Sequence, residues 1–340
     1  MASVSFTARS RHWDAHILRL VVFLAALCLL LLVLKTRDFT SFRTWQTMGV
    51  QFPEVGIMAL GVMLTMITGG IDLSSVGVAN MTGVVTATVM LAMAPRGAAA
   101  GQQLTAVLVA VLLALLIGVV AGALNGFLVA VVRIPAILVT LGTLELFTGI
   151  AVLLSGGESI SGLPPAYTSV LGGRIAGIPT PLIIFVVVAL IVGFVLHKMS
   201  FGAKLYLLGS NATAAKFSGL NSAWLLVRTY ALSGLCAAVA GLVLMANYNS
   251  AKADNGVSYT LLTVLIVVLG GVHPNGGSGK LLGVLLAIAI LQILSSSVNW
   301  FHQINGFYRF LIFGAVLLIV ISTADLRSRF RFRRNSQEQQ

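Results

Sequence analysis

The sequence has very few charged residues for its length. Asp, Glu, Lys and Arg make up 9% of its 340 residues, while 58% are hydrophobic. A soluble domain has roughly 25% charged residues, so this chain has too few charges to form the hydrated surface of a soluble protein. The chain is therefore expected to lie in a lipid bilayer. A lipid environment requires internally paired backbone groups, which leaves helices or a closed barrel. The apolar runs are long and continuous and do not alternate, which excludes a barrel and predicts a bundle of membrane helices.

Cysteine and acidic residues are also scarce. The two cysteines, Cys28 and Cys236, lie inside apolar runs and offer neither a disulfide framework nor a metal-ligand spacing. His197, His273 and His302 fall at loops or span ends without matching carboxylates, so an intramembrane enzyme is not indicated. The 21 basic residues exceed the 9 acidic ones, which fits the basic cytoplasmic ends of membrane helices rather than nucleic-acid binding. We therefore expect a non-catalytic chain that binds no metal, cofactor or nucleic acid.

The hydropathy pattern predicts an all-α polytopic bundle of about ten transmembrane helices, forming one domain over residues 1–340 with the membrane part at 17–324. The N-terminal apolar stretch is followed by Lys35 without a small-residue cleavage site, so we expect an uncleaved first span rather than a signal peptide. The predicted spans are 17–34, 45–69, 73–94, 103–132, 134–155, 179–198, 224–249, 257–272, 279–298 and 304–324.

Two glycine pairs interrupt this pattern. Gly69-Gly70 and Gly270-Gly271 stand beside the third and eighth predicted spans, where they predict either broken or re-entrant helices. The segments 60–74 and 261–279 also share one order of an apolar run, two glycines and polar residues. This similarity is consistent with the internal repeats common in transporters.

The basic residues predict the orientation of the chain. An even number of spans places both termini on one side, and the tail at 325–340 is strongly basic, with arginines at 327, 329, 331, 333 and 334. The positive-inside rule assigns that side to the cytoplasm. With this orientation, basic residues lie on the predicted cytoplasmic side about twice as often as on the external side.

Small residues recur at helical spacing within two predicted spans. Because lipid provides no hydrophobic drive between helices, such stripes allow close packing. They indicate either ordinary bundle packing or a sliding surface used in gating. The stripes are Gly118, Gly122 and Gly126 in one span and Gly234, Ala237, Ala238 and Gly241 in another.

Polar residues inside the spans are the candidates for a solute pathway. Glu145 lies near the middle of its span. Inserting an ionised side chain there costs about 2.5–3.5 kcal/mol, so Glu145 is either a proton or ligand site or an inter-helix hydrogen-bonding group. Asp72 follows a glycine pair, where it can serve either as a helix cap or as a pathway residue. Glu54 follows Pro53 within the second predicted span. A path lined by amides and hydroxyls suits an uncharged hydroxylated solute, although such groups also hold helices together. The candidate pathway residues are Asp72, Asn80, Asn125, Thr143, Glu145, Asn247, Asn249 and Gln292.

The longest predicted cytoplasmic loop, 199–223, contains a helix signal. Asn211 is a good N-cap, residues 212–218 favour helix, and Gly219 is a suitable stop. The predicted helix, about 10 Å long, either docks into a cytoplasmic partner or rests on lipid headgroups through Lys204 and Lys216. The chain has no ATPase motif of its own, because the glycine-rich stretch 274–281 lacks the first glycine of a P-loop and the hydroxyl residue after its lysine.

Four separated segments now resemble a known family in their order and residues: 69–74 (GGIDLS), 133–143 (RIPAILVTLGT), 201–221 and 268–279 (VLGGVHPNGGSG). They are similar to the permeases of the ribose, rhamnose and autoinducer-2 branch of bacterial ABC importers. The segments 141–157, 177–184 and 196–198 look most similar to an autoinducer-2 permease. The chain departs from the family pattern at Asn211-Ala212-Thr213, usually Asn-Pro-Glu, at Ala203, usually Arg, and at 259–262, where two acidic residues are missing.

The resemblance implies a multi-pass permease of the bacterial inner membrane that imports a small neutral sugar-like solute. It implies a second permease, identical or sister, a periplasmic sugar-binding protein, and separate ATPase subunits that hold ATP and Mg²⁺. The residues it assigns to ATPase coupling are Gly202, Lys204, Gly209, Asn211, Ala214, Ala215, Lys216 and Gly219. The alternative is an ion-coupled secondary transporter, which requires paired titratable groups at mid-membrane, where Glu145 is nearly alone.

Overall fold

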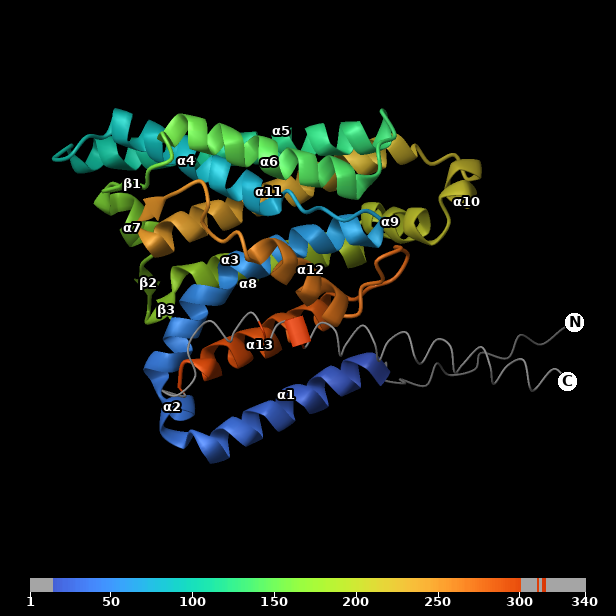
Figure 1. Ribbon diagram of the computed structural model, residues 1–340, viewed down its shortest axis with the longest axis horizontal. Coiled ribbons are helices and arrows are strands. Elements are labelled where there is room, and N and C mark those ends of the chain that lie inside the picture. The colour runs from blue at the N-terminus through green and yellow to red at the C-terminus, as the bar shows by residue number, and fades with distance from the viewer. Residues whose placement is uncertain (1–14, 301–310, 312–313, 316–340) are drawn as a thin grey trace, which may run out of the picture.

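The computed structural model describes residues 15–300 together with 311, 314 and 315. Within these residues, eight helices are long and apolar enough to cross a membrane, and Figure 1 shows them running side by side along the long axis of the molecule. They are α1 (Ala15–Leu34), α3 (Phe42–Ile67), α4 (Ser75–Met93), α5 (Ala100–Ala130), α6 (Ala136–Ser155), α8 (Thr180–Lys198), α11 (Ser222–Tyr248) and α13 (Leu281–Val298). The predicted all-α polytopic membrane bundle is confirmed.

The two glycine pairs have different consequences for the helices beside them. Gly69-Gly70 separates two long helices, α3 and α4, and breaks neither. The predicted span at 257–272 instead forms α12 (Tyr259–Leu269), whose 11 residues extend about 16 Å, roughly half of the hydrocarbon core. Gly270 caps its C-terminus. The expected tenth span, 304–324, and the basic tail, 325–340, lie outside the described residues except for 311, 314 and 315.

The connections divide the bundle into two dissimilar ends (Figure 1). One end, called the α10 end below, carries α9 (Ser200–Ser210) and α10 (Ala212–Phe217). The opposite end carries α2 (Thr36–Thr40), α7 (Pro165–Leu171) and two small antiparallel pairs. In these pairs, β1 (Ile160–Ser161) joins β4 (Ser250–Ala251), and β2 (Arg174–Ile175) joins β3 (Ile178–Pro179). The loop 156–178 therefore contains a short helix and is tied to the segment after α11.

Helices α3 and α11 form the centre of the bundle, because α11 packs against α3, α4 and α5 together. Glycines allow α5 and α11 to approach at the level of the backbone. A Cβ added to Gly118 would lie 2.5 Å from that of Ala238, and one added to Gly126 would lie 2.6 Å from the Cα of Val227. The two small-residue stripes meet where Gly118 and Gly122 face Gly234 and Ala238, while Gly241 packs against Ala79 of α4. Small residues thus allow close packing in both places, as expected for helices in lipid.

Candidate translocation site

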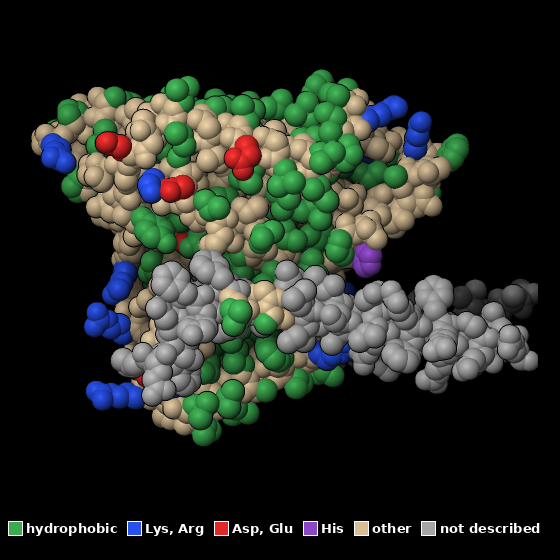
Figure 2. Space-filling view, viewed as in Figure 1, with side chains coloured by type: hydrophobic (Ala, Val, Ile, Leu, Met, Phe, Trp, Pro, Cys, Tyr) green, Lys and Arg blue, Asp and Glu red, His purple; other side chains and the backbone are tan. Residues whose placement is uncertain are grey.

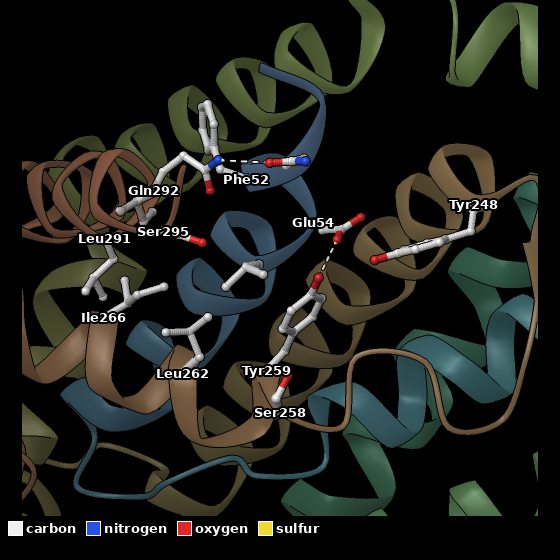
Figure 3. A pocket seen from close by; sticks show the side chains of 13 residues that line it. Phe52, Glu54, Tyr248, Ser258, Tyr259, Leu262, Ile266, Leu291, Gln292 and Ser295 are labelled. Atoms are coloured by element: carbon white, nitrogen blue, oxygen red, sulfur yellow. Dashed lines mark hydrogen bonds between the residues drawn. The ribbon is translucent and has the colours of Figure 1, made fainter. Parts of the chain in front are cut away.

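A cavity of about 250 Å³ opens between α3, α12, α13 and the end of α11. This volume approaches that of typical small-ligand sites. Figure 3 shows Glu54 and Tyr259 pointing toward each other on one side and Gln292 on the other. Leu262 lies between them, and Ile266 and Leu291 lie on the side of Gln292. The cavity thus presents carboxylate, phenol, amide and hydroxyl groups around an apolar floor. Its polar lining residues are Gln51, Glu54, Tyr248, Ser258, Tyr259, Gln292 and Ser295.

Glu54 is the most constrained polar group of this cavity. It is 3% exposed, and its two carboxylate oxygens accept hydrogen bonds from Tyr259 Oη at 2.8 Å and from Asn247 Nδ2 at 2.9 Å. Asn247 also donates to the carbonyl of Val50. Pro53, one residue before Glu54 inside α3, lacks the N–H that a regular helix would use there. Glu54 therefore joins α3, α11 and α12 at the cavity.

Asp72 lies in a separate, fully buried cluster at the turn between α3 and α4. Its Oδ1 accepts from the backbone N–H and the hydroxyl of Ser74 at 3.0 and 2.6 Å, and its Oδ2 accepts from Ser233 Oγ at 2.7 Å. Asn125 donates to Ser74 Oγ at 2.7 Å. The N-cap residue of α4 is Ser74, so Asp72 bonds the N–H of that residue and none inside the helix. Asp72 ties this turn to α11 and, through Ser74, to α5.

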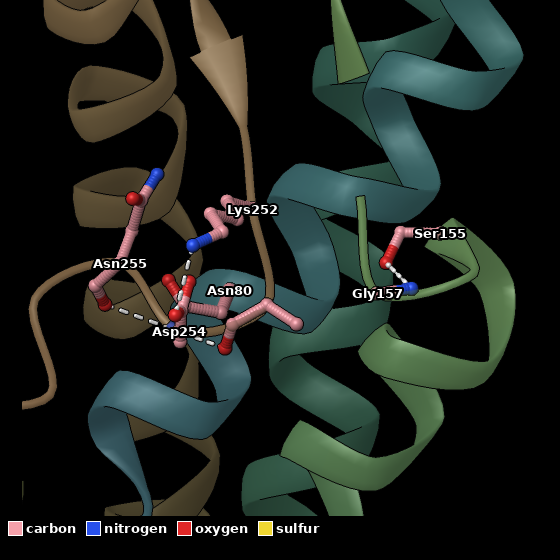
Figure 4. A network of polar contacts seen from close by, with 7 residues as sticks. Asn80, Ser155, Gly157, Lys252, Asp254 and Asn255 are labelled. Atoms are coloured by element: carbon pink, nitrogen blue, oxygen red, sulfur yellow. Dashed lines mark hydrogen bonds and ion pairs between the residues drawn. The ribbon is translucent and has the colours of Figure 1, made fainter. Parts of the chain in front are cut away.

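Asn80 holds the segment between α11 and α12. Its Nδ2 donates to the carbonyls of Ala253 and Asn255, both at 2.8 Å (Figure 4). The same segment begins at Asn249, which caps α11 in the left-handed conformation with φ of 49°. Figure 4 also shows the Lys252–Asp254 ion pair, at 3.0 Å, beside these bonds. Asn80 therefore positions the chain that leads into the cavity-lining α12.

Glu145 occupies a different surface. It is exposed at the middle of α6, and no described ion pair includes it. Leu138 and Leu153 of the same helix are 62% and 81% exposed, so the carboxylate stands on an apolar face. Figure 2 shows an acidic group over α6, with hydrophobic side chains on the same face. Thr143, buried beside it, donates to the carbonyl of Val139 within its own helix.

The candidate pathway residues thus fall into separate groups. Gln292 lines the cavity, and Asn247 reaches it through its bond to Glu54. Asp72 and Asn125 share one cluster, Asn80 binds the segment that follows Asn249, and Thr143 lies with Glu145 on α6. Sequence reasoning noted Glu54 but did not include it among the pathway residues, and it missed Gln51, Tyr248, Ser258, Tyr259 and Ser295. The position of Glu54 directly after a proline inside an apolar helix was the available signal.

The helix predicted in the 199–223 loop is confirmed as α10. Asn211 Oδ1 accepts from the N–H of Ala214 at 2.9 Å, and Gly219 follows with φ of +77°. The buried Ala215 packs on the main core, whereas Phe217 is 89% exposed. A second helix, α9, precedes α10 and was not predicted. Together they form an arm at one end of the bundle (Figure 1).

The arm is joined to the bundle through glycines and backbone groups. The N–H of Gly277 donates to the carbonyl of Ile67 at 2.9 Å, and a Cβ on Gly209 would lie 2.5 Å from that same nitrogen. Tyr206 donates to the carbonyl of Gly279 at 2.9 Å, and burial raises the pKa of its phenol, which keeps the donor proton in place. We call this contact of α9, the α3 terminus and the 270–280 loop the glycine junction.

A polytopic helical bundle with a polar cavity and a projecting helical arm has the architecture of a membrane transport protein. The chain belongs to the family described as the permease component of the branched-chain amino acid transport system, which matches residues 47–321. It is therefore a multi-pass membrane permease subunit, with a transport role.

Curated relatives and one solved structure are similar to this chain. The autoinducer 2 import system permease protein LsrD of Yersinia enterocolitica is 32% identical over 273 residues, covering 78% of this chain and 79% of that protein. The protein of the same name from Photorhabdus laumondii is 31% identical over 79% of this chain and 75% of its own length. A solved inward-facing structure of a transporter assigned to the metal-chelate ABC type has a TM-score of 0.53 at 17% identity, covering 90% and 98% of the two chains. This last likeness shows the fold alone.

Proposed function

We propose that this chain is the permease subunit of an ATP-driven importer for a small neutral sugar-like solute of the autoinducer-2, ribose or rhamnose type. It sits in the bacterial inner membrane with the α10 end and both termini in the cytoplasm. A periplasmic binding protein delivers the solute, and a separate ATPase holds ATP and Mg²⁺, so this chain is not itself catalytic and binds no cofactor.

The observation that carries this proposal is the exposed arm. An almost fully exposed phenylalanine on a capped helix beyond the apolar bundle is costly in water and is typical of a protein-binding surface. Phe217 provides this anchor, while Asn211 fixes the start of the helix and Gly219 its end. The names of the curated relatives, which are import-system permeases, support the same assignment.

The lining of the cavity supports a neutral polar solute. Glu54 is engaged by Tyr259 and Asn247. Gln292 Nε2 donates to Ser296 Oγ at 3.1 Å and, at 3.5 Å, to Gln51 Oε1, which leaves the Gln292 carbonyl oxygen as an acceptor and the Gln51 amide nitrogen as a donor for a solute. Amides and hydroxyls over an apolar floor match the hydroxyl groups and ring faces of a sugar. We infer that the cavity forms part of the solute pathway.

The exposed face of α6 supports pairing with a second permease. A carboxylate facing lipid at mid-bilayer is costly, so Glu145 requires a water-lined path or a protein partner. Gly142 and Gly149 lie on the same helix with no atoms close to their Cβ positions, which leaves room for a neighbouring backbone. We infer that this face meets a second permease, identical or sister, and borders the pathway between them.

The test is reconstitution in liposomes with the ATPase and binding protein encoded nearby. We expect autoinducer-2 or a pentose, hexose or deoxy-sugar to stimulate both ATP hydrolysis and uptake. Phe217→Ala removes the anchor and should abolish stimulated hydrolysis, whereas Phe42→Ala, which alters a 71% exposed residue at the opposite end, should not. Mass photometry of the complex then distinguishes a self-paired permease from a sister pair. Uptake driven by an ion gradient without the ATPase would establish the alternative, a secondary transporter.

A further inference from the structure

A second hollow of about 600 Å³ lies between α5, α8, α9 and α11 and opens to the surface of the bundle. It is separate from the translocation cavity and shares no lining residue with it. Most of its wall is aliphatic or aromatic, including Val119, Val195, Phe201, Leu225 and Leu232. An apolar groove on a membrane-embedded surface is suited to hydrocarbon rather than to a hydrated solute.

Two cations line this groove. Lys204 of α9 and Arg228 of α11 are both exposed, and no acidic residue is among the lining residues. Neither takes part in an ion pair among the described residues, where the recorded salt bridge, Lys252–Asp254, is at the opposite end. A doubly positive rim without a carboxylate is therefore complementary to an anion from outside the chain.

Trp224 adds a marker of the membrane interface. It lines the groove, is 52% exposed, and lies near the start of α11. Tryptophan favours the headgroup level of a bilayer, where its ring is amphipathic. The Arg228 guanidinium carbon is 4.7 Å from the centroid of this ring, a cation–π contact that orients the side chain. The N–H groups of a guanidinium held in this way suit the bidentate geometry of a phosphate.

We propose that this groove binds an anionic phospholipid. Its acyl chains lie against α5, α8 and α11, and its phosphate lies between Lys204 and Arg228. Basic pockets between membrane helices at the cytoplasmic surface recognise such headgroups. A bound lipid contacts both α9 and the start of α11, so it braces the base of the arm that carries α10. The binding site stands on geometry and charge alone; only the consequence for ATPase coupling rests on the proposed function.

The experiment is a titration of the purified, delipidated chain in neutral detergent, followed by native mass spectrometry. The probes are phosphatidylglycerol and phosphatidylcholine with identical acyl chains, and glycerol 3-phosphate as a headgroup without tails. We expect phosphatidylglycerol to bind about tenfold more tightly than phosphatidylcholine, because its net charge faces two cations. Glycerol 3-phosphate alone should bind far more weakly, since it leaves the apolar groove empty.

Charge-removing variants distinguish recognition of the headgroup by the groove from nonspecific attraction of anionic lipid to the positive surface of the chain. Lys204→Gln with Arg228→Gln should remove the preference for phosphatidylglycerol, whereas Lys198→Gln with Lys216→Gln removes the same charge outside the groove and should keep it. Ala231→Trp, which fills the groove, should weaken both lipids. If the first double variant fails to fold, Arg228→Gln alone tests the same loss of preference for phosphatidylglycerol. Equal binding of the two lipids by the unaltered chain, equal loss in the control pair, or tight binding of glycerol 3-phosphate would each overturn the proposal.

Discussion

Replacing Gly122 by alanine tests the backbone contact between α5 and α11. The added Cβ would lie 2.9 Å from the carbonyl carbon of Tyr230 and 3.0 Å from the Cα of Ala231, and closer still to the Tyr230 carbonyl oxygen. Carbon atoms pack best at about 3.5–4.0 Å. The two helices must therefore separate by about 1 Å along the contact, because the opposing atoms are backbone and cannot rotate away.

The cost follows from the contacts that this separation weakens. If on the order of 40 atom pairs each lose a third of about 0.15 kcal/mol, the loss is about 2 kcal/mol, within the usual range for overpacking. Alanine recovers roughly 0.5–1 kcal/mol through its better helix propensity. We expect Gly122→Ala to lower the free energy of unfolding by about 1–1.5 kcal/mol, and Gly122→Leu to prevent folding.

Equilibrium unfolding in mixed micelles of dodecyl sulfate and a neutral detergent, followed by circular dichroism, measures this difference. Gly142→Ala and Gly149→Ala are matched controls, because nothing lies within 4 Å of a Cβ at either position, and they should be neutral or slightly stabilising. If Gly122→Ala unfolds at the same detergent fraction as these controls, the close helix contact is not present in the folded protein.

Two further substitutions probe the buried polar groups. Asp72→Ala leaves the hydroxyls of Ser74 and Ser233 and one N–H without their acceptor, and it should lower the free energy of unfolding by about 3 kcal/mol. Asp72→Asn retains one acceptor oxygen and should lower it by less. Equal losses in the two variants would show that the carboxylate does not anchor the turn. Asn80→Ala frees two carbonyls of the 250–258 segment, so amide hydrogen exchange in that segment should accelerate while exchange in α5 stays unchanged. Identical exchange of the 250–258 segment in the variant and the unaltered chain would contradict the positioning role of Asn80.

Local signals made the helices predictable. Apolar run length predicted most of the spans, and α10 was predicted within one residue because its cap, Asn211, and its stop, Gly219, act through neighbouring residues. The short α12 agrees with the interrupted helix predicted beside Gly270-Gly271, but its bounds were not predicted, since hydropathy does not distinguish a spanning helix from an apolar half-helix inside a bundle. The preceding α9 was not predicted because no capping side chain marks its start at Met199.

The cavity depended on contacts that no local pattern encodes. Glu54 meets Asn247 and Tyr259 across 193 and 205 residues of sequence, and Asp72 meets Ser233 across 161. Hydropathy places these residues in a span, or at a span end for Asp72, but gives no rotation about the helix axis. The sequence therefore predicted which polar residues lie in the membrane, but it did not predict which of them share a site.

The glycine junction has a mechanical consequence. Flexible side chains between two moving segments can change rotamer and so absorb small displacements. At this junction, however, the carbonyl of Ile67 accepts directly from the backbone N–H of Gly277. Gly209 lies close to both groups, since a Cβ added to it would clash with the Ile67 carbonyl oxygen and the Gly277 nitrogen. We therefore expect a displacement of the arm to move the end of α3 and the loop before α13 with it.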